Sequence, residues 1–451
     1  MKFKEIFIFH LLFFFSYDLA ISANSQTQLL GCGQKQSIAT VIVKNKINPQ
    51  DLKKTNHDES LLLKLSTEQL KFFYGVFHFG LNSAEEFYSI IPNSQELDIL
   101  KEGKDYYYKA TFLADYCGSK SSSFSFDVAL PGTLTSPLKF IKKSSYRKIR
   151  FNKTVKKIFP CTDEEYLNLN FDDLWYTWNP FKSGVDSDNK PFFCSEILKK
   201  FPNAHVKIEF ESIKRIHTKI KKYVPKEIAI IFGKISSITS DKVIEKYLNT
   251  FMTSVEKGKS PPVIDENFDL HALSYFLSSL SERYRITKAS MIDESIVSMN
   301  VLINHQKVTI KLLYSETELN PSSLDYEKKL LSLLQSSDVF IYIGHSGFGK
   351  NLDIKELGRV LKLSEAELKE KMRTKNNQVI GINSCFASSY FGDDVTKFRE
   401  GLTTDFYLSM NSRYLPNFPL FMIERSVEKS GEDFYPKDWM GKFYLKRIYH
   451  E

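Results

Sequence analysis

Residues 338–349 read Asp338-Val339-Phe340-Ile341-Tyr342-Ile343-Gly344-His345-Ser346-Gly347-Phe348-Gly349. The unbroken apolar and aromatic run at 339–343 predicts a strand buried on both faces, and small residues follow it at once. A second stretch has the same form, Val379-Ile380-Gly381-Ile382-Asn383-Ser384-Cys385-Phe386-Ala387-Ser388. Each of the two predicted strands therefore ends in small residues around one reactive side chain, His345 in the first and Cys385 in the second.

Strands and helices alternate on either side of these two stretches. Strands are expected at 227–232, 296–303, 307–314, 339–343 and 379–382, and helices at 240–254, 271–284, 322–334, 352–361 and 365–373. Repeated β-α-β units predict a mainly parallel sheet flanked by helices. Neighbouring parallel strands lie about 4.8 Å apart, so the loops that leave their carboxyl ends can bring an imidazole close to a thiol.

A thiol beside an imidazole is the arrangement of a nucleophilic cysteine. The thiolate is the attacking form, and a nearby His raises its fraction or accepts the proton. Glycine and serine around both residues let a substrate backbone approach closely, and they leave backbone N–H groups free to stabilise an oxyanion. The sequence therefore predicts a Cys385–His345 dyad.

An apolar strand followed by Gly-His-Ser-Gly, and about forty residues later by a strand with Asn-Ser-Cys, resembles the clan of caspases, legumains, clostripain, gingipains and separases. The resemblance covers residues 225 to 425. It implies a caspase-like α/β sandwich, a protein or peptide substrate and no cofactor. It also implies that Cys385 is the nucleophile and His345 the general base and acid, with an oxyanion hole from the backbone N–H of Cys385 and of Ser346 or Gly347. The family usually has Gly directly after the His, whereas Ser346 intervenes here.

The first 23 residues have the pattern of a signal peptide. Lys2 and Lys4 supply the positive end, residues 6–15 are apolar apart from His10, and small residues at 21–23 offer a cleavage site. We therefore expect an exported thiol protease of the periplasm, the cell surface or the secreted fraction, with no transmembrane span once the signal is removed. The Lys-rich composition with few cysteines fits a bacterial envelope protein.

Export makes the five cysteines informative. Four of them lie in the N-terminal half, an even number suited to two disulfides in an oxidising compartment. The local pairings are Cys32–Cys117 and Cys161–Cys194, although four cysteines allow three connectivities. Cys385 stands apart from these four, which marks it as either a free buried thiol or a reactive one.

Three regions are expected after the signal peptide. Residues 24–160 carry short strands at 37–43, 72–79, 105–113 and 122–130 without convincing long helices, which predicts an all-β sandwich-like domain. Residues 161–204 form an aromatic-rich linker, tied by a disulfide if Cys161 pairs with Cys194. Residues 205–451 form the caspase-like α/β domain.

The formal net charge of +8 is partly concentrated between residues 140 and 159, where eight Lys and Arg occur without an acid. One interpretation is a patch for an anionic envelope surface. The other is a solvated, half-buried strand, because Ile149 and Phe151 alternate with charged residues. We favour the strand, and we expect no nucleic-acid partner.

Other chemistries fit the sequence less well. A phosphate-binding loop would need Ser or Thr where Asn351 follows Gly349-Lys350, and a serine nucleophile elbow would need Gly at Phe348. The nine His show no zinc-binding spacing, so no metal is expected. The alternative that remains is a non-catalytic caspase-like scaffold that binds an envelope partner.

Overall fold

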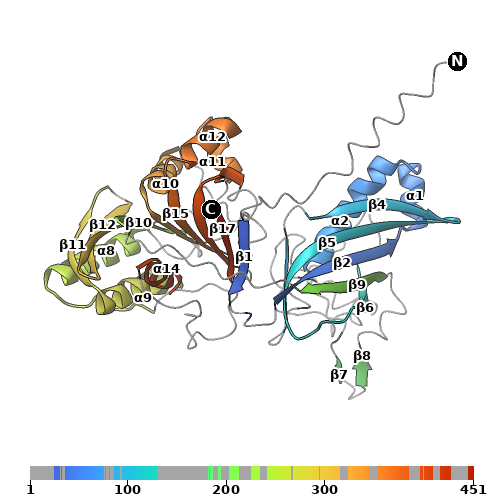
Figure 1. Ribbon diagram of the computed structural model, residues 1–451, viewed down its shortest axis with the longest axis horizontal. Coiled ribbons are helices and arrows are strands. Elements are labelled where there is room, and N and C mark those ends of the chain that lie inside the picture. Colours follow the sequence, from blue (N-terminus) through green and yellow to red (C-terminus); the bar gives the residue numbers. More distant parts are fainter. Residues whose placement is uncertain are drawn as a thin grey trace.

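The computed structural model contains two large sheets, each with its own helices (Figure 1). The structure describes residues 25–30, 32, 36–75, 77, 81, 86–91, 94–130, 181, 183–185, 191–193, 203–212, 225–233, 241–265, 268–293, 295–314, 324–344, 354–384, 387, 397–399, 401–409, 417–427 and 445–450. Structural statements below refer to these residues.

The first sheet is antiparallel and curled. Its order is β3-β5-β2-β9-β6, and β4 also pairs with β5. These strands are β2 (Gln36–Lys46), β3 (Phe87–Ile90), β4 (Glu96–Glu102), β5 (Asp105–Cys117), β6 (Phe124–Ala129) and β9 (Asn203–Ser212). A short hairpin of β7 (Ser183–Val185) and β8 (Pro191–Phe193) forms a third, separate sheet.

Two helices belong to this first unit, and one of them corrects a prediction. Helix α1 (Pro49–Thr55) is followed by α2 (Glu59–Gly75), so the strand expected at 72–79 is wrong as far as residue 75. Phe73, on α2, packs edge to face on Phe112 of β5, with ring centroids 5.8 Å apart. The unit is therefore one antiparallel sheet packed on helices. The expectation of an all-β sandwich fails for the described residues.

The remaining strand predictions of this unit are confirmed, because residues 37–43, 105–113 and 122–130 coincide with β2, β5 and β6 within a few positions. Cys32 and Cys117 are at disulfide distance, with Cα atoms 5.2 Å apart. Cys161 and Cys194 lie outside the described residues, as do the signal peptide at 1–23 and the basic stretch at 140–159.

The second sheet has nine strands in the order β1-β17-β16-β15-β14-β10-β13-β12-β11. Its centre is parallel, comprising β13 (Gln306–Tyr314), β10 (Glu227–Phe232), β14 (Val339–Ile343), β15 (Asn377–Asn383) and β16 (Thr403–Ser409). Antiparallel strands complete both sides: β12 (Ile296–Ile303) and β11 (Arg285–Met291) on one, β17 (Leu445–His450) and β1 (Ser25–Leu30) on the other. The sheet is mixed, with a parallel core.

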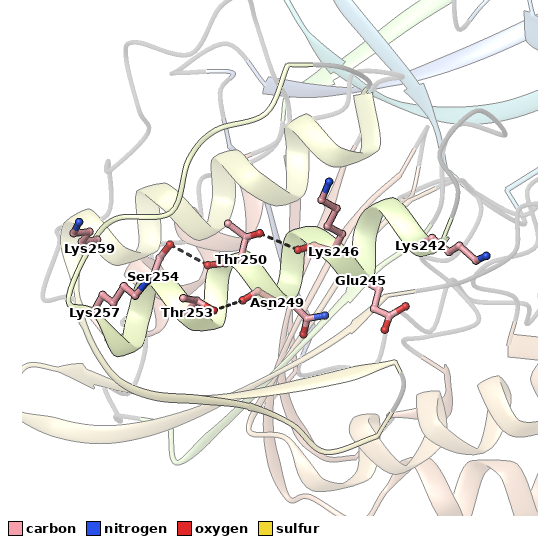
Figure 2. Close-up of a pocket in the computed structure, with 9 residues that line it drawn as sticks. All are labelled: Lys242, Glu245, Lys246, Asn249, Thr250, Thr253, Ser254, Lys257 and Lys259. Carbon is pink, nitrogen blue, oxygen red and sulfur yellow. Dashed lines mark hydrogen bonds between the residues drawn. The ribbon is translucent and has the colours of Figure 1, made fainter.

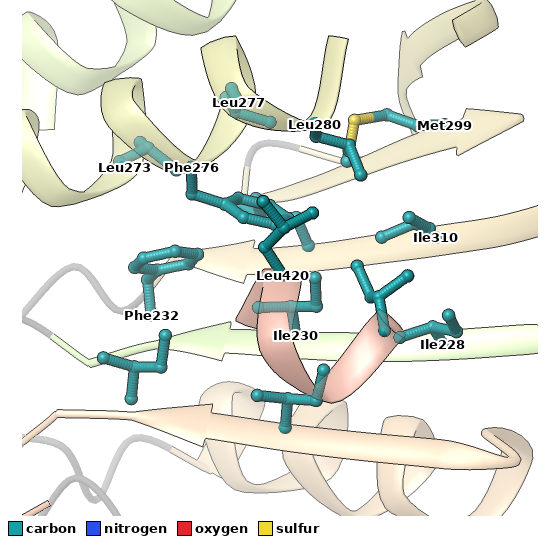
Figure 3. Packing of buried hydrophobic residues seen from close by; sticks show 14 of the residues in the cluster. Ile228, Ile230, Phe232, Leu273, Phe276, Leu277, Leu280, Met299, Ile310 and Leu420 are labelled. Carbon is teal, nitrogen blue, oxygen red and sulfur yellow. The ribbon is translucent and has the colours of Figure 1, made fainter. Parts of the chain in front are cut away.

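Helices cover both faces of the parallel core. The first face packs on α8 (Asp241–Glu256), α9 (Phe268–Arg283) and α14 (Phe418–Val427). The second face packs on α10 (Leu324–Ser336), α11 (Ile354–Val360) and α12 (Glu365–Met372). Along one strand, the side chains of alternate residues pack on opposite faces of the sheet. Figure 3 shows Ile228, Ile230 and Phe232 of β10 on the first face, beneath Phe276 of α9. Ala229 and Ile231 belong to the core of the second face.

The predictions for this half are largely confirmed. Strands β10, β12 and β14 have the expected bounds, and β13, β15, α8, α9, α10, α11 and α12 differ from the expected ranges by a few residues at their ends. Long apolar strands are easy to locate because the sheet buries them on both faces.

The expected domain boundaries need correction at two places. Strand β9 pairs with β2 and β6 of the first sheet, so the chain enters the second unit only after Ser212 and not at residue 205. Strand β1, expected in the N-terminal domain, pairs with β17 of the second sheet. Both differences arise from pairings between segments far apart in the sequence.

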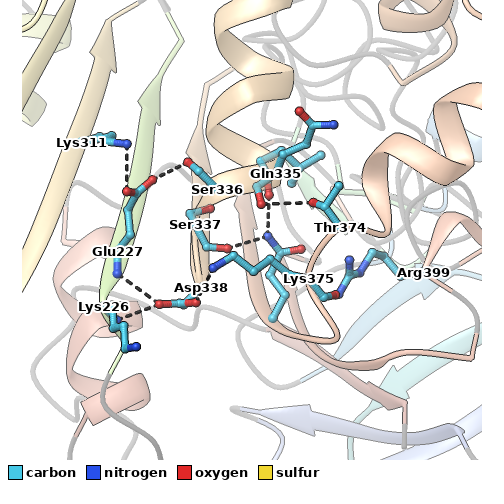
Figure 4. A network of polar contacts seen from close by, with 12 residues as sticks. Lys226, Glu227, Lys311, Gln335, Ser336, Ser337, Asp338, Thr374, Lys375 and Arg399 are labelled. Carbon is cyan, nitrogen blue, oxygen red and sulfur yellow. Dashed lines mark hydrogen bonds and ion pairs between the residues drawn. The ribbon is translucent and has the colours of Figure 1, made fainter.

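Polar contacts tie together the amino ends of the parallel strands (Figure 4). The Asp338 carboxylate accepts hydrogen bonds from the backbone N–H of Lys226 (2.7 Å) and of Glu227 (3.1 Å), and it pairs with Lys375 at 3.0 Å. These contacts join the starts of β10, β14 and β15, so they fix the registry of the strands that lead to the opposite, carboxyl edge.

None of the described helices combines the length and the hydrophobicity needed to cross a bilayer.

Candidate active site

The two strands chosen from the sequence are immediate neighbours in the sheet. Strands β14 and β15 run parallel, and their register places Ile343 opposite Asn383. The backbone N–H of Gly344 donates to the carbonyl of Asn383 at 3.2 Å, so the pairing extends one residue beyond β14. His345 and Cys385 each come two residues after this last matched pair.

The reactive residues themselves lie outside the described part of the chain. This applies to His345, Cys385, Ser346 and Gly347. The described residues next to them are Gly344 and Ser384, which are both buried. The structure therefore brings together the two backbone positions from which the predicted dyad projects. The approach of the imidazole to the thiol stays a prediction.

The chain leaves β10 and β14 in opposite directions. After β10 it continues to α8, which packs on the first face of the sheet, whereas after β14 it continues to α11, which packs on the second face. In α/β proteins, ligands commonly bind beyond the carboxyl ends of adjacent parallel strands whose following helices pack on opposite faces of the sheet. His345 follows β14 at this point of divergence.

Backbones pack closely at the carboxyl ends of β10 and β14. The N–H of Gly233 donates to the carbonyl of Ile343 at 2.7 Å. A Cβ atom on Gly344 would lie 3.0 Å from the Cα of Gly233 and 2.9 Å from Cζ of Tyr342. The absence of a side chain at Gly344 therefore lets the end of β14 lie close to β10.

A charged cluster lies beside the same edge, in the loop between β11 and β12. The N–H of Tyr314, at the carboxyl end of β13, donates to the carbonyl of Ser295 at 3.2 Å. Asp293 accepts from the backbone N–H of Ser295 at 2.8 Å and of Ile296 at 2.9 Å, and Lys329 lies 3.5 Å away. Desolvation raises the pKa of Asp293, but these hydrogen bonds and Lys329 outweigh it and hold the pKa below its usual value.

The described residues also contain an open hollow of about 790 Å³ along α8, shown in Figure 2. Its lining is Lys242, Glu245, Lys246, Asn249, Thr250, Thr253, Ser254, Lys257 and Lys259. The three hydroxyl groups donate back to helix carbonyls at 2.9 to 3.0 Å, so their protons are not available to a ligand. This surface is polar and basic, and it contains neither His nor Cys.

No group of three or more His, Cys, Asp and Glu in the described part of the chain is arranged to hold a metal ion.

One residue that contacts this edge, Ser409, is not among the residues predicted from the sequence. Ser409 ends β16, and its hydroxyl bonds to the backbone of Ser384, directly before Cys385. A serine at the end of one more strand carries no signal of its own in a single sequence. Only the pairing of β16 with β15 reveals its position.

The chain was compared with protein-family models, with curated proteins and with solved structures, and none of the three comparisons found a match.

Proposed function

We propose that this chain is a caspase-like cysteine peptidase that hydrolyses peptide bonds through Cys385 and His345. The observation that carries the proposal is the parallel pairing of β14 with β15, in which Ile343 lies opposite Asn383. Two loops that start level with one another, about 4.8 Å apart, can bring a thiol and an imidazole within hydrogen-bond reach. The helices on both faces of the parallel core support the caspase-like α/β sandwich.

The proposed reaction has two stages. The Cys385 thiolate attacks the carbonyl carbon of the scissile peptide bond, and the resulting oxyanion is stabilised by the backbone N–H of Cys385 and of Ser346 or Gly347. The His345 imidazolium then gives its proton to the departing amine, which leaves a thioester on Sγ. In the second stage His345 removes a proton from water, the hydroxide attacks the thioester carbonyl, and the peptide acid and the thiolate are released.

The other parts of the proposal concern where the protein acts. We propose that residues 1–23 are an export signal, and that the protein works in the periplasm, at the cell surface or outside the cell. The disulfide distance between Cys32 and Cys117 supports an oxidising compartment.

The second candidate function is a non-catalytic caspase-like scaffold. Ser346 favours it, because it displaces glycine from the position after His345 where the peptidases of this clan usually have it. In that case the protein would bind an envelope partner without cleaving it.

A thiol-reactive peptide probe separates the two functions. The peptidase predicts labelling near neutral pH that disappears in Cys385→Ala and falls strongly in His345→Ala. Labelling should survive in the double variant Cys161→Ala/Cys194→Ala, which controls for other thiols. Limited proteolysis is included as a second condition because such peptidases are often made with a covered cleft. A folded protein that stays unlabelled under both conditions, and cleaves no member of a peptide library, would establish the scaffold instead.

A further inference from the structure

The Ser409 hydroxyl makes two contacts with one buried residue. Its Oγ accepts a hydrogen bond from the backbone N–H of Ser384 at 3.1 Å and donates to the carbonyl oxygen of the same residue. The exposed fraction is 0% for Ser409 and 2% for Ser384, so water does not reach these groups. The hydroxyl uses both its donor and its acceptor capacity on Ser384, one residue before Cys385.

These contacts begin where the strand ladder ends. The last matched pair of β15 and β16 is Ile382 with Leu408, so among the described residues the ladder ends before Ser384. Buried backbone groups need hydrogen-bond partners, and the side chain of Ser409 supplies them in place of a strand. On the other side, the carbonyl of Asn383 accepts from Gly344 of β14 at 3.2 Å.

The two residues before Cys385 are therefore held from both neighbouring strands. Asn383 is bonded to Gly344, which directly precedes His345, and Ser384 is bonded to Ser409. A thiol that must attack a carbonyl at a fixed angle depends on the backbone that carries it, and a displacement of about 1 Å can cost about a hundredfold in rate.

We propose that Ser409 is a positioning residue for Cys385, because it holds the backbone of Ser384, the residue that directly precedes Cys385 in the chain. The proposal rests on the peptidase function put forward above. Ser409 does not touch the substrate in this scheme, and it acts through Ser384 alone.

The test compares Ser409→Ala and Ser409→Thr with the wild-type chain. Removing the hydroxyl should lower kcat about 10- to 100-fold with KM changed less than about twofold, because orientation and not binding is lost. Threonine keeps the hydroxyl and should restore at least part of kcat. The matched control is Ser337→Ala, which removes a buried hydroxyl that has no hydrogen-bond partner among the described residues, at the amino end of β14. Its kcat should equal that of the wild type.

A second measurement does not depend on peptidase activity. The rate of Cys385 alkylation by iodoacetamide, followed by peptide mass spectrometry between pH 5 and 9, reports the thiol environment directly. Ser409→Ala should shift this pH profile, and Ser409→Thr should return it toward that of the wild type.

The outcomes separate the two proposals. If the wild type cleaves peptides through Cys385 but Ser409→Ala behaves like Ser337→Ala in both measurements, the positioning role is refuted and the peptidase stands. If no cleavage occurs but Ser409→Ala still shifts the alkylation profile and threonine reverses it, the peptidase and the catalytic positioning role are both refuted, and only an influence of Ser409 on the thiol environment of Cys385 is left. If cleavage is absent and the profile is unchanged, both are refuted.

Discussion

Arg399 is the largest fully buried side chain of the described residues, and its removal is a sharp test of how the sheet is held at its amino edge. Its guanidinium donates to the carbonyl oxygens of Met372 and Lys375, both at 2.7 Å, and to Oγ1 of Thr404 at 3.2 Å. Met372 ends α12, so the cation also lies at the favourable end of a helix dipole. We predict that Arg399→Met destabilises the protein.

The magnitude follows from two opposing effects. Hydrogen bonds from a charged donor contribute about 1.5–3 kcal/mol each, so the two short bonds amount to about 3–6 kcal/mol. Against this, desolvation and then the charge of Arg373 lower the pKa of Arg399 to about 10, from an ordinary value of 12.5. At about 1.4 kcal/mol for each pKa unit, the buried charge costs about 3 kcal/mol, which the variant recovers. Taking the middle of the first range, the expected net loss of unfolding free energy is about 1.5 kcal/mol.

Urea denaturation followed by far-ultraviolet circular dichroism measures this loss, provided that the m-value is unchanged. Arg373→Met is the matched control: it removes a neighbouring cation that disfavours the charged form of Arg399, so stability should stay level or rise slightly. If Arg399→Met were as stable as the wild type, the cost of burying the charge would equal the stabilisation by the hydrogen bonds. The predicted loss of unfolding free energy would then be refuted.

Three further substitutions test the edges of the second sheet. Gly344→Ala should destabilise by about 1–3 kcal/mol and slow any Cys385-dependent hydrolysis, because its Cβ would press on the buried ring of Tyr342. Asp338→Asn should cost about 1–3 kcal/mol in urea melts, because Lys375 and two backbone donors lose a charged acceptor. Asp293→Asn should be less stable than the wild type near neutral pH, and this difference in unfolding free energy should become smaller as the pH falls. The depressed pKa of Asp293 contributes stability above the unfolded pKa of about 3.9, and this contribution is lost as the pH falls through the folded value.

Each of these has a control. Gly358→Ala, where the nearest atom to the new Cβ is Leu368 Cδ2 at 3.2 Å, should be tolerated because alanine also favours the helix. Lys375→Met should cost less than Asp338→Asn, because the lysine is about one-third exposed and water can replace its partner. A stability difference between wild type and Asp293→Asn that stays constant from pH 7 to pH 3 would contradict the assignment of a stabilising charge to Asp293.

The predictions from the sequence succeeded for short segments in which nearly every residue is apolar, because such a segment is typical of a strand that is buried on both faces. The runs at 228–232 and 339–343 are apolar or aromatic throughout, and they lie in strands β10 and β14. The predictions failed where an aromatic run is compatible with the periodicity of a strand and also with that of a helix. The aromatic content of residues 72–79 predicts a strand, but Phe73 and Phe77 are four residues apart and both are buried, as one face of a helix requires.

The candidate site was predictable only in part. Two strand ends with a His and a Cys are visible in the sequence, and their order along the chain suggests that they meet. The sequence does not show that β14 and β15 are neighbours or how their residues are matched. This register depends on hydrogen bonds between segments about forty residues apart. The contact of Ser409 with Ser384 depends on the same kind of pairing, one strand further along.

Taken alone, the sequence determined which segments are buried, where the two residues of the predicted dyad lie along the chain, and that strands and helices alternate in the second half. These follow from local hydrophobic pattern and residue chemistry. The tertiary structure alone decided that β9 joins the first sheet, that β1 closes the second beside β17, and that Ser409 holds the residue before Cys385. Such contacts join residues distant in sequence, and their free energy appears only when the whole sheet has formed, so no local pattern records them.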